Sequence, residues 1–293
     1  MPNLKDIRTR IASVKNTQKI TSAMKMVSAA KLRRAQERAE QARPYALKMD
    51  LVISSVAGRV QDATHPLLQV NELPSKALVI VVTSNRGLCA GFNANVFRTL
   101  ARFLREQAAA GVEVHLATVG RKGDVFYRTR DTKVARNYTD VIGNISYAKA
   151  KKIAQDAIEN FVAGEYDRVY IIYNEFVSAI AYNTNIHQLL PLSLDDLAAA
   201  PAADLAASEY IFEPDEDSLL ERLLPANIEV QVLRALLEAE ASEHAARMSA
   251  MDSATTNAKE MISALTLQYN RARQAYITKE LVEIVSGAEA LKG

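Results

Sequence analysis

Two long stretches of the chain repeat mostly apolar residues in alternating steps of three and four. The C-terminal series passes through Leu237, Ala241, His244, Met248, Met251, Thr255, Ala258, Ile262, Leu265, Tyr269, Ala272 and Tyr276. This heptad spacing places the residues on one face of a long helix. Neither Gly nor Pro occurs between Ala226 and Ser286, so the pattern predicts one continuous helix over residues 226–288.

The N-terminal stretch has the same spacing and predicts a long helix over residues 1–57. Its series is Ile7, Ile11, Val14, Gln18, Thr21, Lys25, Ser28, Leu32, Ala35, Ala39, Ala42, Ala46, Met49 and Ile53. The middle of this series is polar, whereas Ile20, Met24 and Val27 form an apolar stripe one position away. We interpret this change as a shift of register, a stutter. Pro44 is expected to kink the helix or to end it early.

The two heptad series lie at opposite ends of one chain. They predict an antiparallel coiled coil formed by the N- and C-terminal helices, although each series could instead pair with another chain.

The middle of the chain has a different pattern, in which strands alternate with helices. The expected strands are Ala77–Thr83, Val112–Val119, Arg168–Phe176 and a weaker one near Gln188–Leu192, and the expected helices are Asn93–Ala109 and Ile145–Val162. This alternation predicts a central α/β domain over residues 75–193 with a largely parallel sheet. Residues 194–222 are acidic and start rich in Ala, Pro and Asp, which predicts a linker and return segment.

Composition and charge narrow the class of protein. The 293 residues are 49% hydrophobic, which is enough for a packed core, and a single Cys excludes an internal disulfide. No run approaches the ~20 apolar residues of a membrane span. The net charge of +2 conceals twelve Lys and Arg within residues 1–50 and nine acids within residues 195–221. This asymmetry indicates either solvated surfaces, a protein partner or nucleic acid.

Residues that could perform chemistry are scarce. The turn from Ser84 to Asn93 contains neither of the glycine-rich phosphate-binding motifs. Cys89 is expected to be buried and structural, since a nucleophile needs a nearby base and no His signature accompanies it. The four His are scattered without metal-ligand spacing, and His244 is expected to pack on the coiled-coil seam. We therefore expect no catalytic residue, no cofactor and no metal.

Three segments carry a family signature. They are residues 16–27 (NTQKITSAMKMV) with Ala30, Lys31 and Leu32 following, residues 83–96 (TSNRGLCAGFNANV) and residues 277–288 (ITKELVEIVSGA). In sequence, order and spacing they resemble the gamma subunits of F-type ATP synthases, and the resemblance covers the whole chain. Two departures concern the turn, where Asn85 replaces a common Asp and Ala90 replaces a common Gly. No thiol switch is expected, because the cysteine-bearing insertion of chloroplast relatives is missing.

The resemblance implies a non-catalytic rotating shaft. In this family the paired helices stand inside a ring of three alpha and three beta subunits, and the α/β domain lies against the epsilon subunit and the c-ring of the membrane sector. It implies no nucleic-acid partner and no insertion into the membrane. The initiating Met and the lack of a transit peptide favour a bacterial protein at the cytoplasmic face of the inner membrane.

The resemblance also assigns contact residues. Contacts with the catalytic beta subunits map to Met24, Lys25, Arg273, Gln274, Thr278 and Glu280. A shaft also needs an apolar tip that can turn within its sleeve, and the C-terminal residues Ile284, Val285, Ala288 and Leu291 could form it.

Two other classes of protein share some of these features. An α/β enzyme with helical extensions would turn over nucleotide alone. A basic coiled-coil protein that binds nucleic acid would show an affinity that falls steeply with salt. The N-terminal helix has no aromatic residue before Tyr45 and its cations are spread around it, which favours an acidic protein partner over nucleic acid.

Overall fold

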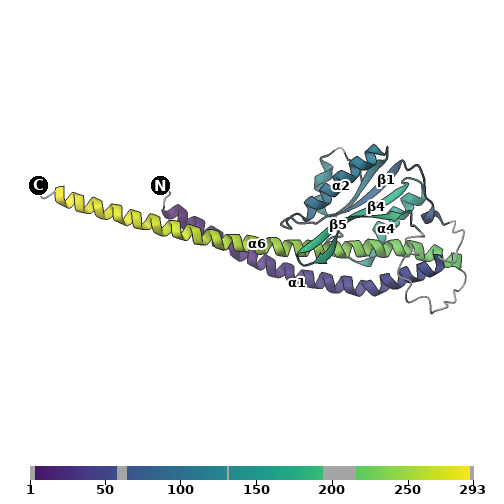
Figure 1. Ribbon diagram of the computed structural model, residues 1–293, viewed down its shortest axis with the longest axis horizontal. Helices are drawn as coiled ribbons and strands as arrows, with labels where there is room; N and C mark the ends of the chain where they lie inside the picture. Colours follow the sequence, from purple (N-terminus) through teal and green to yellow (C-terminus); the bar gives the residue numbers. More distant parts are fainter. Residues whose placement is uncertain (1–3, 58–64, 131, 194–215, 291–293) are drawn as a thin grey trace. The chain divides into compact units, whose positions relative to one another are not determined.

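The structure is a computed structural model, and it describes residues 4–57, 65–130, 132–193 and 216–290 (Figure 1). Two helices account for much of the chain: α1 spans Leu4–Ala57 with 54 residues, and α6 spans Glu216–Ala290 with 75 residues. The chain divides into two compact parts. The coiled-coil part comprises residues 1–28 and 248–293, and the central part comprises residues 29–247. Each helix contributes to both parts.

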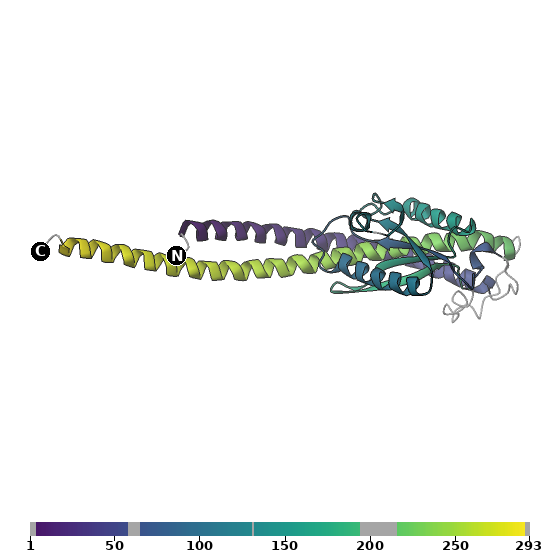
Figure 2. The same cartoon turned by 90° about the horizontal axis from the view of Figure 1, so that it is seen from above.

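In the coiled-coil part, the two helices run antiparallel and side by side (Figures 1 and 2). The Thr21 and Thr255 hydroxyls share a hydrogen bond of 2.8 Å, and Lys25 Nζ lies 2.6 Å from Asp252 Oδ1. Along α6, seam positions from Met248 to Ala272 are buried or half-buried. This confirms the predicted antiparallel pairing of the two seams within one chain.

The predicted stutter in α1 is wrong. Thr21 and Ser28 are buried, whereas Ile20 is 60% exposed and Val27 is 56% exposed. The original heptad register therefore continues through the polar stretch. Its hydroxyls are satisfied locally, because Thr21 pairs with Thr255 and Ser28 Oγ donates to the Met24 carbonyl at 2.8 Å. Polar seam residues with hydrogen-bond partners cost little to bury, so the helices keep one register, with Ile20 and Val27 exposed and Met24 half-buried.

The central part contains a five-stranded sheet in the order β3-β2-β1-β4-β5. The strands are β1 Lys76–Val82, β2 Glu113–Val119, β3 Val134–Tyr138, β4 Arg168–Ser178 and β5 Ala181–Leu190. The strands β1 to β4 are all parallel to one another, and β5 pairs antiparallel with β4. The largely parallel sheet is thus confirmed.

Two edge strands differ from the sequence-based expectation. The last strand begins at Ala181 and ends at Leu190, so the prediction near Gln188–Leu192 was too short and too late. The strand β3 was missed altogether. The strands β3 and β5 lie at the two edges of the sheet and are less buried than β1, so they contain polar and exposed residues. They therefore lack the continuous apolar run by which β1 could be predicted.

Both faces of the sheet are covered by helices (Figure 1). Along β1, Leu78, Ile80 and Val82 pack in one cluster with α4, which spans Tyr147–Val162, and with α6. The alternate residues Ala77, Val79 and Val81 pack in a second cluster against α2, Phe92–Ala109. A short helix that was not predicted, α3, spans Arg121–Arg128 beside α2, and a 3-10 turn, η1, spans Pro66–Leu68. This alternation explains why β1 reads as a continuous apolar run.

Both prolines near the helix ends lie inside helices. The helix α1 continues through Pro44 to Ala57, so an early end at this residue is wrong. The helix α6 begins at Glu216 and includes Pro225, so it starts upstream of residue 226. Burial of Leu220, Leu224 and Ile228 stabilises this part of α6. It offsets the loss of the backbone hydrogen bond that Pro225 cannot donate. Of the predicted linker at residues 194–222, residues 194–215 lie outside the described residues and the rest is helical.

Candidate functional site

The turn between β1 and α2 is held by its own polar groups. The backbone N–H of Ser84 donates to Asn93 Oδ1 at 3.0 Å, and Ser84 Oγ donates to the Arg86 carbonyl at 2.7 Å. Cys89 is buried beside Ser84, as expected, and burial raises the pKa of its thiol. The sulfur of Cys89 lies near Ser84 Oγ, the Arg86 carbonyl and Asn93 Nδ2, so the thiol is enclosed within a hydrogen-bonded turn.

The two departures from the family pattern have structural consequences. Asn85 Nδ2 donates to the Ile142 carbonyl at 2.7 Å, while its Oδ1 accepts from the Arg121 N–H at 3.0 Å. An Asp carboxylate could accept the second bond but could not donate the first. Ala90 has φ of 46°, in the left-handed region that favours glycine. The turn therefore depends on the amide of Asn85 and holds Ala90 in a strained conformation.

Within the central part, Arg38 joins three elements. From α1, its Nη1 donates to Glu240 Oε2 of α6 at 3.0 Å, and its Nη2 donates to the Ile145 carbonyl before α4 at 2.6 Å. The Glu240 side chain is only 9% exposed, whereas that of Arg38 is 42% exposed. A carboxylate this deeply buried needs a charged partner, so Arg38 ties both helices to the α/β domain.

Two further residues of α6 bind backbone carbonyls of the α/β domain. Ser242 Oγ is buried and donates to the Asn174 carbonyl in β4 at 3.0 Å. Arg247 forms an ion pair with Glu243 at 2.7 Å. Its Nη2 also donates to the backbone carbonyls of Arg86 and Gly87 in the turn, each at 3.3 Å. We call Arg38, Ser242 and Arg247, with the carbonyls they bind, the helix–sheet junction.

The electrostatics of this junction are those of buried charges. Burial raises the pKa values of Glu240 and Glu243, and the opposing attraction of Arg38 and Arg247 respectively reduces that rise. Burial, followed by the charge of Arg247, lowers the pKa of His244 to about 4. His244 is half-buried on the seam, as predicted. The imidazole of His244 is therefore neutral in the folded protein at ordinary pH.

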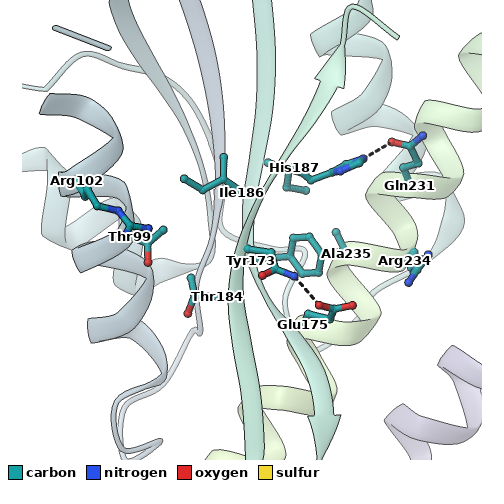
Figure 3. A pocket seen from close by; sticks show the side chains of 12 residues that line it. Thr99, Arg102, Tyr173, Glu175, Thr184, Ile186, His187, Gln231, Arg234 and Ala235 are labelled. Carbon is teal, nitrogen blue, oxygen red and sulfur yellow. Dashed lines mark hydrogen bonds between the residues drawn. The ribbon is translucent and has the colours of Figure 1, made fainter. Parts of the chain in front are cut away.

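A polar cleft of about 510 Å³ lies at the open edge of β5 (Figure 3). His187 meets Gln231 of α6 at 3.0 Å, and Glu175 accepts from Asn185. Arg102 of α2 and Arg234 of α6 lie on opposite sides of the strands (Figure 3). These groups bond to neighbours rather than converge on one point, so the cleft does not form a catalytic constellation. Among the described residues, no cluster of His, Cys, Asp or Glu could hold a metal ion.

The contact residues assigned by resemblance all lie on α1 and α6 in the coiled-coil part. Met24 and Lys25 are half-buried, and Lys25 pairs with Asp252. The α6 residues of the set are exposed: Arg273, Gln274, Thr278 and Glu280. In the apolar tip, Ile284 is 68% exposed, Val285 is 55% exposed and Ala288 is exposed, while Leu291 lies outside the described residues. Every side chain over residues 273–289 is exposed.

Sequence reasoning missed two sets of residues. Ile20 and Val27, which flank Met24 on α1, were assigned to the helix core but are exposed. Their spacing was the available signal, and it was read in the wrong register. The junction residues Arg38 and Ser242 left no signal, because their partners are backbone carbonyls whose positions depend on the fold.

Comparison with known proteins agrees with this architecture. The family model described as ATP synthase matches residues 3–291. The chain is 53% identical over 293 residues to the ATP synthase gamma chain of Geobacter metallireducens, with 100% of both chains covered. It is 52% identical over 294 residues to that of Anaeromyxobacter dehalogenans, with 99% of this chain and 100% of the relative covered.

Solved structures give the same result. The central stalk and c-ring structure of Tetrahymena thermophila mitochondrial ATP synthase contains a similar chain, with a TM-score of 0.60 and 28% identity over 80% of this chain and 99% of that one. A chain of the Euglena gracilis mitochondrial enzyme shares the fold, with a TM-score of 0.67 and 23% identity over 98% and 94% of the two chains.

The full-length matches agree with the paired helices, the mostly parallel sheet and the lack of a catalytic constellation in the described part of the chain. No helix within the described ranges has both the length and the hydropathy of a bilayer span. The chain belongs to the ATP synthase gamma chain family and is a non-catalytic, central-stalk subunit of this membrane-associated F-type complex.

Proposed function

We propose that this chain turns inside a ring of three alpha and three beta subunits and couples rotation of the c-ring to changes in nucleotide affinity. Since one asymmetric shaft meets the catalytic sites in different orientations, each site has a different affinity at any moment. This is allosteric coupling through differential contacts. The chain itself catalyses no step.

The observation that carries this proposal is the exposure of α6 over residues 273–289. Apolar residues in this range, among them Ile277, Leu281 and Ile284, are about half exposed or more. A monomeric protein rarely leaves such a group of apolar side chains in water, and such patches mark interaction sites. An enclosing ring of subunits would bury them.

The contact residues remain as assigned by resemblance. The beta-subunit contacts are Met24, Lys25, Arg273, Gln274, Thr278 and Glu280, and the apolar tip includes Ile284, Val285 and Ala288. We add Ile20 and Val27 to this set, because they are exposed on the helix face that also carries Met24.

The central α/β part is proposed to bind the epsilon subunit and the c-ring at the cytoplasmic face of a bacterial inner membrane. Torque from the c-ring would then enter this part and reach α1 and α6 through the helix–sheet junction. Arg38, Ser242 and Arg247 bind carbonyls of three different segments of the α/β part. Contacts at several points resist sliding of the helices better than one contact would.

A substitution at Ala258 tests the role of the paired helices as a stiff shaft. Ala258 is buried on the seam, in the interior of α6. A proline there removes a backbone hydrogen bond, clashes with the preceding turn and costs about 3 kcal/mol or more. We expect Ala258→Pro to allow some complex to assemble but to lower proton-driven ATP synthesis sharply relative to ATP hydrolysis, as measured in inverted membrane vesicles.

The matched control is Ala258→Gly, which keeps the backbone hydrogen bond and costs only about 1 kcal/mol. It should retain most of the coupling. If Ala258→Pro gives the same ratio of proton-driven ATP synthesis to ATP hydrolysis as Ala258→Gly, the helix pair is not a stiff rotor element.

A further inference from the structure

A groove of about 480 Å³ in the central part is separate from the contact residues and from the junction. Its floor is formed by small residues of α1, including Ala39 and Ala42, and by Leu233 and Leu237 of α6. A volume of this size is typical of sites for small organic molecules. The walls are mainly apolar, so water in the groove gains few hydrogen bonds.

Aromatic rings from three elements line the same groove. They are Tyr45 of α1, Tyr147 of α4 and Phe176 of β4. The two tyrosines are exposed. The hydrogen bond to Glu229, followed by burial, raises the pKa of Tyr147 to about 12, so its ring is uncharged at ordinary pH. Tyr147 is held in place by a hydrogen bond from its hydroxyl to the buried carboxylate of Glu229. Ring faces attract cations through their quadrupole, so these rings favour a positive ligand.

The charged residues of the walls point to the same conclusion. Glu40 of α1 and Glu238 of α6 both line the groove, and the one cation in its described lining is Arg234. Arg234 Nε donates to Glu238 Oε1 at 2.8 Å, while Glu238 Oε2 is buried without a hydrogen-bond partner among the described residues. Carboxylates therefore outnumber cations, and the walls carry an incompletely compensated negative charge.

We propose that this groove binds an organic cation with an apolar body, such as an arylalkyl ammonium. The ammonium would lie near Glu40 and the tyrosine rings, and the apolar body would cover Ala39, Ala42 and Leu237. An anion would face the two carboxylates. An inorganic cation would lack ligands, since the described residues hold no cluster of metal-binding side chains there.

Three probes of nearly equal shape test this proposal on the full-length chain: phenylbutylammonium, phenylbutanol and phenylbutanoate. Their dissociation constants are measured by ligand-observed NMR titration. We expect the ammonium to bind about fivefold more tightly than the alcohol, and the carboxylate to bind most weakly. The preference for the ammonium should shrink as salt is added, because Glu40 is exposed.

Two variants locate the site. Glu40→Gln removes one charge and should reduce the preference for the ammonium about threefold, and Tyr147→Leu removes one ring and should weaken the ammonium more than the alcohol. Glu37→Gln is the matched control, since Glu37 lies on the same helix, is exposed and does not line the groove. The proposal is overturned if no probe binds at millimolar concentration, if all three bind equally, or if Glu40→Gln behaves like Glu37→Gln.

Discussion

Replacing Arg38 by methionine tests whether the helix–sheet junction stabilises the central part. The substitution keeps a long unbranched side chain but removes the ion pair with Glu240 and the 2.6 Å hydrogen bond to the Ile145 carbonyl. Removing one partner of a fully buried ion pair costs about 3–5 kcal/mol. Arg38 is itself partly exposed, and solvent screens its charge, so we expect a loss of about 2–3 kcal/mol in the free energy of unfolding.

The pH dependence of this loss separates charge from packing. Burial raises the pKa of Glu240, and Arg38 opposes that rise. In the Arg38→Met variant the pKa of Glu240 should therefore rise further. A carboxyl with a raised pKa destabilises the folded state when it is ionised and stops doing so once it is protonated. The penalty of the variant should consequently shrink as the pH falls below that raised pKa.

The assay is urea unfolding of the full-length chain, followed by the near-ultraviolet circular dichroism of the tyrosines in the α/β part. Arg34→Met is the matched control, because Arg34 lies on the same helix, is exposed and forms no ion pair with the described side chains. It should change stability by no more than about 0.5 kcal/mol. Equal losses for Arg38→Met and Arg34→Met, or a loss at Arg38 that does not depend on pH, would refute the reasoning.

Two other substitutions test local features. Ala90→Gly should raise the free energy of unfolding by about 0.5–1 kcal/mol, because glycine adopts the left-handed conformation of this position without strain. The control Ala101→Gly, in the interior of α2, should lower it by about 1 kcal/mol. A loss of stability for both variants in urea unfolding would contradict the assignment of strain to Ala90. The lowered pKa of His244 predicts stability that is fully present above pH 6.5 and lost as the pH falls toward about 4, by up to about 3 kcal/mol. His244→Gln should remove this part of the acid sensitivity, and identical unfolding midpoints for the two proteins across this pH range would count against it.

Elements with strong periodicity or continuous burial could be predicted from the amino-acid pattern alone. The heptad series from Leu237 to Ala272 predicted α6, because an uninterrupted repeat has only one helical solution. The run around Leu78–Val82 predicted β1 for a similar reason, since both faces of that strand are buried. The three family segments, at residues 16–32, 83–96 and 277–288, then indicated the class of protein. The contact residues assigned by the resemblance stay a prediction.

Which side chains the helices bury and which they leave exposed depends on contacts between distant parts of the chain, and the amino-acid pattern does not show these contacts. Thr21 and Ile20 are neighbours in sequence, and hydropathy alone placed the wrong one in the seam. The hydroxyl of Thr255 across the interface provides the hydrogen bond that allows Thr21 to be buried. The same holds for Glu240, whose burial depends on Arg38 being brought beside it from the other end of the chain. A polar side chain can be buried when a hydrogen-bond or charge partner is buried beside it. Arg38 and Glu240 are 202 positions apart in sequence, so only the fold brings the two side chains together.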